Sequence, residues 1–129
     1  MFKDKTTLLS SSNLVYQFKC PGCIKSYIGK TESTLFNRTK EHGWKDKASA
    51  IYKHFDHCSA WKEIVDFFQT DGVEVDLMQF NVNAVRENTK IIRKSDNWLK
   101  LAFLESLTIK EYKPDLNTGI RSCKDLALF

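Results

Sequence analysis

Hydrophobic and polar residues alternate along residues 14–18, and this pattern predicts a half-buried β-strand near the N-terminus. Residues 20–23 read Cys-Pro-Gly-Cys, a sequence that favours a turn. Residues 26–29 return to strand-forming side chains. Together these segments predict a β-hairpin with two cysteines at its tip.

Two helices are expected after the hairpin. Thr31 or Ser33 can cap the first helix, and Gly43 is expected to end it. The second helix follows Ser49, because its inward-facing positions recur at spacings of three, four and seven residues. These positions are Ile51, His54, Phe55 and Cys58.

The second half of the chain predicts one strand and one long helix. Met78, Phe80 and Val82 alternate with polar residues, which favours a third, half-exposed strand. The long helix is expected to run from about Asp96 to Tyr112, and a proline closes it off. The pattern as a whole predicts a fold of the α+β class.

Length and composition indicate one soluble domain. The chain has 129 residues, of which 42% are hydrophobic and 28% are charged, so it can bury a core and is too apolar for a disordered chain. No linker or internal repeat divides it, and residues 1–129 are expected to form a single domain. No apolar run approaches the length of about 18 residues that a membrane span needs. We expect a soluble, intracellular protein of the cytoplasm or nucleus of a host, without a membrane partner.

The net charge of +4 is small but unevenly distributed. Residues 16–62 contain nine Lys or Arg and four Asp or Glu, whereas residues 63–129 contain nine and eleven. A basic surface on the first half would suit a polyanion such as DNA. Solubility alone would explain the same charge, so the distribution does not decide the partner.

Glu105 is the only charged residue among residues 101–109. A helix places it on one stripe with five other residues that should face inward, namely Trp98, Leu101, Ala102, Ile109 and Tyr112. A carboxylate there needs a cation or an arginine beside it. Mg²⁺ is satisfied by one or two carboxylates together with water and phosphate oxygens. The alternative is a glutamate in an ion pair at the rim of the core.

Two further pairs carry chemistry. Arg38 and His42 are four residues apart and would project from the same side of a helix, as a phosphate clamp and a proton carrier. Tyr16 and Tyr27 lie on the two arms of the predicted hairpin. Taken alone, the first pair would be surface residues and the second pair ordinary core residues.

The order and spacing of these residues resemble the GIY-YIG nuclease family. The resemblance covers about residues 14–118: Val-Tyr at 15–16, Tyr-Ile-Gly-Lys-Thr at 27–31, Arg38 and His42, Leu-Glu at 104–105, and Lys-Pro-Asp-Leu-Asn at 113–117. Leu-Val-Tyr at 14–16 stands where the family has Gly-Ile-Tyr, and the tyrosine is kept. The resemblance implies a small three-stranded antiparallel sheet flanked by helices, with the site on the sheet face.

The resemblance also implies a role for each motif residue. Tyr16 would be the general base or would position the attacking water, and Tyr27 would shape the site. Arg38 would neutralise phosphate oxygens, and His42 would accept the Tyr16 proton. Glu105 would hold one Mg²⁺ or Mn²⁺. The remaining assignments are Asn117 as a buttress of the site and Gly29 and Lys30 as substrate-binding residues.

Four residues suggest a second metal site. Cys20 and Cys23 come from the predicted turn, and His54 and Cys58 are one helical turn apart, a set that suits tetrahedral zinc. His57 is the alternative fourth ligand. A redox pair or plain turn cysteines are the other interpretations. Cysteines between the two tyrosine motifs, with His or Cys partners downstream, are similar to the GIY-YIG domains of Penelope-like retroelements, which favours structural zinc.

The sequence thus predicts a metal-dependent DNA endonuclease of the mobile-element, phage or homing type. Without an appended recognition module, its partner would be DNA bound with low sequence specificity, or it would be targeted as a homodimer or by a partner. Because one active site cuts one strand, double-strand cleavage would require two protomers or two sequential nicks. The alternative function is a zinc-stabilised nucleic-acid-binding module without catalysis.

Overall fold

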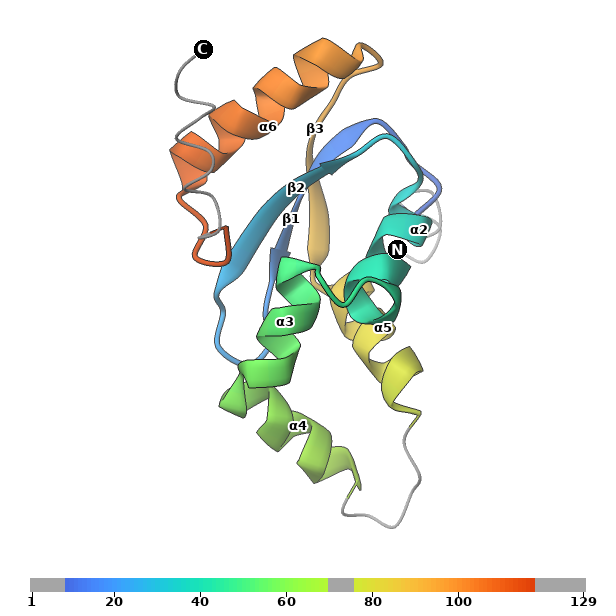
Figure 1. Ribbon diagram of the computed structural model, residues 1–129, viewed down its shortest axis with the longest axis vertical. Helices are drawn as coiled ribbons and strands as arrows, with labels where there is room; N and C mark the ends of the chain where they lie inside the picture. Colours follow the sequence, from blue (N-terminus) through green and yellow to red (C-terminus); the bar gives the residue numbers. More distant parts are fainter. Residues whose placement is uncertain (1–8, 70–75, 118–129) are drawn as a thin grey trace.

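The computed structural model describes residues 9–69 and 76–117 and shows an α+β fold (Figure 1). Three strands form an antiparallel sheet: β1 (Leu14–Lys19), β2 (Ser26–Thr31) and β3 (Thr89–Lys94). Their order is β2-β1-β3, so that β1 is central and β2 is an edge strand, whose outer edge pairs with no other strand among the described residues. The expected antiparallel sheet flanked by helices is therefore confirmed within the described residues.

Helices cover both faces of the sheet (Figure 1). One face carries α6 (Trp98–Tyr112), where Val15 and Ile28 pack against Leu101. The opposite face carries the helices that lie between β2 and β3. These are α2 (Leu35–Lys40), a π-helical turn η1 (Glu41–Lys45), α3 (Ala50–His57), α4 (Ser59–Gln69) and α5 (Leu77–Glu87).

Alternation along β1 determines which side chain meets which layer, because successive residues of a strand point to opposite faces. Leu14, Tyr16 and Phe18 turn toward the α2–α5 side, where Leu35 packs on Tyr16 and Phe55 packs on Phe18. These three side chains are each at most 1% exposed. The central strand therefore contributes to both cores of that face.

The third strand lies later in the chain than the sequence predicted. The segment that contains Met78, Phe80 and Val82 forms α5, which Asp76 caps through Gln79 N–H. Alternation over five residues is too short to exclude a helix, and the buried positions Val82 and Val85 follow helical spacing. The strand instead occupies Thr89–Lys94, directly after that helix.

The first helix also differs from its prediction. Its N-cap is Thr34, and the helix does not end at Gly43 but continues through the π-helical turn to Lys45. Gly43 is buried because α5 approaches it: a Cβ at this position would lie 2.8 Å from the Cα of Val82. The glycine thus permits close packing of two helices and is not a helix C-cap.

The inward stripe of α6 is shifted from its predicted position. Leu101 and Thr108 are buried, whereas Trp98 is 67% exposed and Tyr112 is 44% exposed. The N-cap is Asn97 in place of the predicted Asp96. The second predicted helix is confirmed as α3, with Ser49 as its N-cap. The described residues include no helix long and apolar enough to cross a membrane.

Gly43→Ala tests the contact between η1 and α5. The added methyl group would meet backbone atoms of Val82, which cannot rotate away. We expect the free energy of unfolding to fall by about 1–3 kcal/mol. Urea denaturation measures it, with Asn37→Ala, an exposed site on α2, as the control that should change it by less than about 0.5 kcal/mol. Equal stability of the two variants would contradict the packing role.

Candidate functional site

Tyr16 is the centre of a polar cluster on the sheet face. It stands opposite Gly29 in the β1–β2 register, and its hydroxyl lies directly over that glycine. A Cβ at position 29 would lie 2.5 Å from the Tyr16 Oη and 2.8 Å from the Tyr27 ring. The missing side chain of Gly29 therefore makes room for the Tyr16 hydroxyl above the edge strand.

Tyr27, on the same face, lies beside Tyr16 and His42. Its ring centroid is 6.3 Å from that of Tyr16 and 5.5 Å from that of His42. Burial raises the pKa of Tyr27, an effect that Arg38 opposes. Burial also raises the pKa of Tyr16, and Tyr27 adds to this effect while Arg38 again opposes it. Both phenols are therefore neutral in the structure.

The helical segment after β2 supplies Arg38 and His42. The Arg38 Nε–H donates to Tyr16 Oη at 3.3 Å, and a terminal nitrogen of Arg38 pairs with Glu41 at 2.7 Å. His42 is 1% exposed, and its Nε2 hydrogen-bonds to the same Tyr16 Oη. Burial lowers the pKa of His42 to about 3, and Arg38 acts in the same direction. His42 is thus a neutral imidazole.

The π-helical turn η1 carries His42. Such turns insert an extra residue into a helix and often occur at functional sites. Here the turn follows α2 without a break, so Arg38 and His42 both reach Tyr16. Sequence spacing of four residues anticipated their shared side, although not the change in helix type.

Glu105 lies at the outer edge of β2. It projects from α6 and is half-buried, close to the Lys30 backbone. Burial raises the pKa of Glu105, while Lys30, Arg38 and the Lys30 backbone N–H oppose that rise. Its charge in turn raises the pKa of both Tyr16 and Tyr27. The carboxylate is therefore within electrostatic reach of the tyrosine cluster.

Asn117 holds the same edge of β2. Its side-chain oxygen accepts from Ile28 N–H and its amide nitrogen donates to Ile28 C=O, both at 2.8 Å. Leu116 N–H donates to Ser26 C=O at 2.8 Å in the same region. Asn117 thus occupies backbone groups beside Tyr27, as a structural support and not as a contact of the hydroxyl cluster.

The structure therefore brings together Tyr16, Tyr27, Arg38 and His42, with Glu105 and Asn117 along the adjacent strand edge. Two polar partners were not singled out as site residues from the sequence. Glu41 pairs with Arg38, and the Ser49 hydroxyl hydrogen-bonds to His42 Nδ1. The sequence marked Ser49 only as a helix cap, because its reach to His42 depends on tertiary packing.

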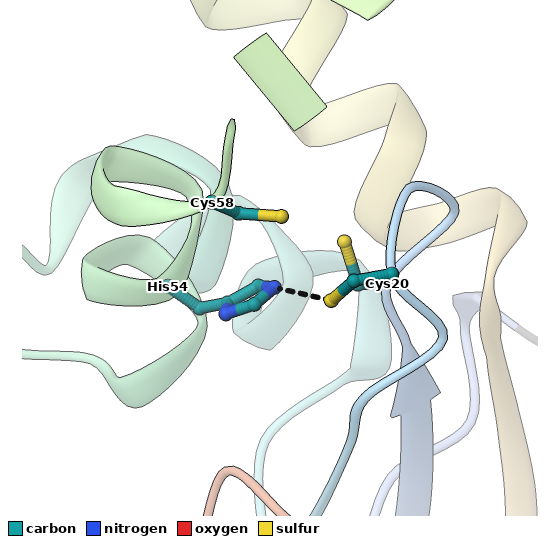
Figure 2. Close-up of side chains that lie close together, drawn as sticks. Cys20, His54 and Cys58 are labelled. Carbon is teal, nitrogen blue, oxygen red and sulfur yellow. Dashed lines mark hydrogen bonds between the residues drawn. The ribbon is translucent and has the colours of Figure 1, made fainter. Parts of the chain in front are cut away.

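A second cluster, which we call the Cys₃His cluster, lies at the turn between β1 and β2. Cys20 and Cys23 flank this turn, while His54 lies on the last turn of α3 and Cys58 follows as its C-cap. The ligand atoms all lie within 4.8 Å of one another. Figure 2 shows the labelled Cys20, His54 and Cys58 turned toward one another. Such a set could hold a tetrahedral metal ion such as zinc.

His57 lies outside the Cys₃His cluster. It is exposed, and its ring nitrogen contacts the Lys53 carbonyl at 2.9 Å. His54, by contrast, has its Nε2 3.2 Å from the Cys23 sulfur. Of the two candidate fourth ligands, the geometry selects His54.

The surroundings of the Cys₃His cluster favour a thiolate at Cys58 but not at Cys20. Backbone N–H groups of Gly22 and Trp61 point at the sulfurs of Cys20 and Cys58, each at 3.4 Å. Burial still raises the pKa of Cys20 to about 11. For Cys58 burial acts in the same direction, but hydrogen bonds from Trp61 and from the other thiols outweigh it and lower the pKa. A bound cation would remove the remaining cost of the buried thiolates.

Tight packing joins the turn that carries Cys20 and Cys23 to the segment that follows Cys58. A Cβ on Gly22 would lie 2.9 Å from the Trp61 nitrogen and 3.0 Å from the Ala60 carbonyl carbon. The cysteine turn therefore lies directly against the start of α4. The cysteine pair belongs to an antiparallel hairpin, which is not the βαβ setting of a thioredoxin-type redox pair.

Zinc, if the Cys₃His cluster binds it, should stabilise the chain, and its removal should destabilise it. With free zinc at 100 times its dissociation constant, we expect metal binding to add about 2.7 kcal/mol to the free energy of unfolding. Cys58→Ser should lose both the bound zinc and this stabilisation, whereas His57→Gln should keep them. Atomic spectroscopy measures the zinc content. Denaturation with and without a chelator measures the stabilisation. Full zinc content in Cys58→Ser would exclude this ligand set.

The neutral state of His42 should make the fold sensitive to acid. The unfolded chain binds a proton at this histidine below about pH 6.5, whereas the folded state does so only near pH 3. Stability must therefore fall as the pH falls through this window, by up to about 1.4 kcal/mol per pH unit. Denaturation from pH 7 to pH 4 measures the slope, which His42→Gln should reduce and the exposed His57→Gln should not. Equal slopes of stability against pH in the wild type and His42→Gln would refute the contribution of His42 to acid sensitivity.

The chain matches no protein-family model, no curated protein and no solved structure.

Proposed function

We propose that the chain is a divalent-metal-dependent endonuclease that hydrolyses phosphodiester bonds in DNA. The observation that carries this proposal is the convergence of Arg38 and His42 on the Tyr16 hydroxyl, with Glu105 in electrostatic range. These residues come from separate parts of the chain. Their order also resembles the GIY-YIG motifs.

Each residue type fits a step of phosphodiester hydrolysis. The transition state gathers negative charge, which a guanidinium stabilises, and Arg38 is partly exposed, with 26% of its side chain accessible. The Tyr16 hydroxyl would orient the attacking water, and Tyr27 would limit the space around it. Lys30 adds positive charge beside Glu105 and would attract the DNA backbone.

Glu105 is the residue that would hold Mg²⁺ or Mn²⁺. Its half-buried carboxylate is disfavoured as an anion by burial, and a cation would relieve that cost. A single carboxylate is sufficient, because Mg²⁺ keeps several waters and takes phosphate oxygens as ligands. When bound, the ion would supply charge stabilisation to the phosphate.

The Cys₃His cluster would contribute structure to this enzyme. It joins the hairpin to α3, and it is made of residues other than those around Tyr16. Cutting both strands of a duplex would require two protomers or two successive nicks, because the described part of each chain forms one such site. A zinc-stabilised nucleic-acid-binding module remains the competing function, since the Cys₃His cluster does not require catalysis.

Nicking of supercoiled plasmid with Mg²⁺ or Mn²⁺ tests the proposal. We expect Glu105→Gln, which keeps the shape but removes the charge, to lower the rate by about 100-fold or more. Glu111→Gln is the matched control, because Glu111 lies on the same helix, is exposed and pairs with Arg93. The control should keep the wild-type rate.

Two results would contradict the proposed endonuclease activity. The first is a wild-type chain that never nicks DNA with either metal yet retards it in a gel, which would favour the binding module. The second is equal rates for Glu105→Gln and Glu111→Gln, which would remove Glu105 from the chemistry.

A further inference from the structure

The Ser49 hydroxyl has three neighbours, and only one of them belongs to the tyrosine cluster. As the N-cap of α3, its oxygen accepts from Ile51 N–H at 3.2 Å and from Tyr52 N–H at 3.5 Å. The same oxygen hydrogen-bonds to Nδ1 of His42. Ser49 is 6% exposed and His42 is 1% exposed, so bulk water does not compete for either group.

A count of protons decides the direction of the Ser49–His42 bond. A serine hydroxyl has one hydrogen to donate and two lone pairs to accept with. The two backbone N–H groups of α3 fill the lone pairs, so the hydroxyl hydrogen is what remains for His42. Nδ1 of His42 is therefore the acceptor.

The acceptor role of Nδ1 determines which nitrogen of the His42 ring carries the proton. A neutral imidazole carries one proton, and with Nδ1 bare that proton is on Nε2. Nε2 is the atom that contacts Tyr16 Oη. His42 thus donates to the phenol oxygen, as does the Nε–H of Arg38 from another direction.

We infer that Ser49 is a positioning residue that fixes His42 as a hydrogen-bond donor to Tyr16. This inference rests on the proposed function only where it concerns catalysis, since the hydrogen-bond direction stands by itself. It differs from the role that the family resemblance implies, in which His42 accepts the Tyr16 proton, because in this tautomer the nitrogen that faces Tyr16 already carries a proton.

The donor role of His42 has a consequence for Tyr16. With two donors occupying its lone pairs, the Tyr16 hydroxyl proton is turned away from both partners. Because Tyr16 is only 1% exposed, this proton can reach a water or a phosphate oxygen only when one enters the cluster. The same two donors would stabilise the oxygen if it ionised, because hydrogen bonds to a charged form favour that form. His42 and Arg38 would then act together as an anion hole for the phenol oxygen.

Imidazole NMR measures the inference directly. In ¹⁵N-edited long-range spectra of the full zinc-loaded chain, a protonated ring nitrogen is well separated from a bare one. His42 is assigned as the signal that disappears in His42→Gln. We expect Nε2 to be protonated and Nδ1 bare in the wild type and in Ser49→Thr, which keeps the hydroxyl and the cap. In Ser49→Asp, which keeps the cap but can only accept, Nδ1 should become protonated. A protonated Nδ1 in the wild type overturns the inference.

Plasmid nicking provides the second readout and separates positioning from helix capping. Ser49→Ala should lower kcat by at least about tenfold with little change in KM for DNA, and Ser49→Thr should restore it to within a few-fold. Asp76→Ala removes the cap of α5 and is the matched control, which should keep kcat. If Ser49→Ala loses no more kcat than Asp76→Ala, positioning is refuted.

The two readouts distinguish the inference from the proposed function. A wild type with the expected tautomer and no nicking activity refutes the endonuclease and leaves the hydrogen-bond assignment intact. A wild type that nicks DNA with Nδ1 protonated refutes the role of Ser49 and leaves the endonuclease intact.

Discussion

The Tyr16 ring can lie across the edge strand only because Gly29, its partner in the hairpin register, has no side chain. This contact places a phenol oxygen above β2, where Arg38 and His42 reach it from the helical layer. Any side chain at position 29 would push the ring away from both partners. The polar cluster therefore depends on a backbone approach within one hairpin, and the helices that follow supply the partners.

Helix α3 connects the two clusters of the molecule. Ser49 caps its first turn and hydrogen-bonds to His42, while His54 on its last turn belongs to the Cys₃His cluster. A metal ion in that cluster would fix one end of a helix of eight residues, and its other end orients the imidazole beside Tyr16. A metal in the Cys₃His cluster and the Tyr16 hydroxyl would thus be coupled through a single short helix. The outer edge of β2 is held in a similar way by residues from the C-terminal part, because Asn117 binds Ile28 and Glu105 lies beside Lys30.

Much of the site was visible in the sequence because its residue types are costly or unusual where they stand. Glu105 indicated a site because it is a single charge in an apolar helix. Cys20 and Cys23 indicated a metal site because they form a pair in a turn. The fold class and the hairpin followed from local patterning. The third strand did not, because the alternation of Met78, Phe80 and Val82 also fits the buried stripe of a helix over so short a segment. The outer positions Trp98 and Tyr112 were wrongly placed inside for a related reason, since a helical stripe does not show where the supporting sheet ends.

The sequence by itself determined which chemical groups the chain has and how they are spaced: two tyrosines on a hairpin, an arginine and a histidine four residues apart, an isolated carboxylate, and three of its four cysteines with candidate histidine partners. These are local properties, carried by residue type and by the periods of strand and helix. Only the tertiary structure decided which of two histidines joins the cysteines, that Gly43 serves helix packing, and that Ser49 touches His42. Such contacts link residues that are far apart in the sequence or on different elements. Their geometry comes from the packing of layers, and the periodicity of one strand or helix does not determine that packing.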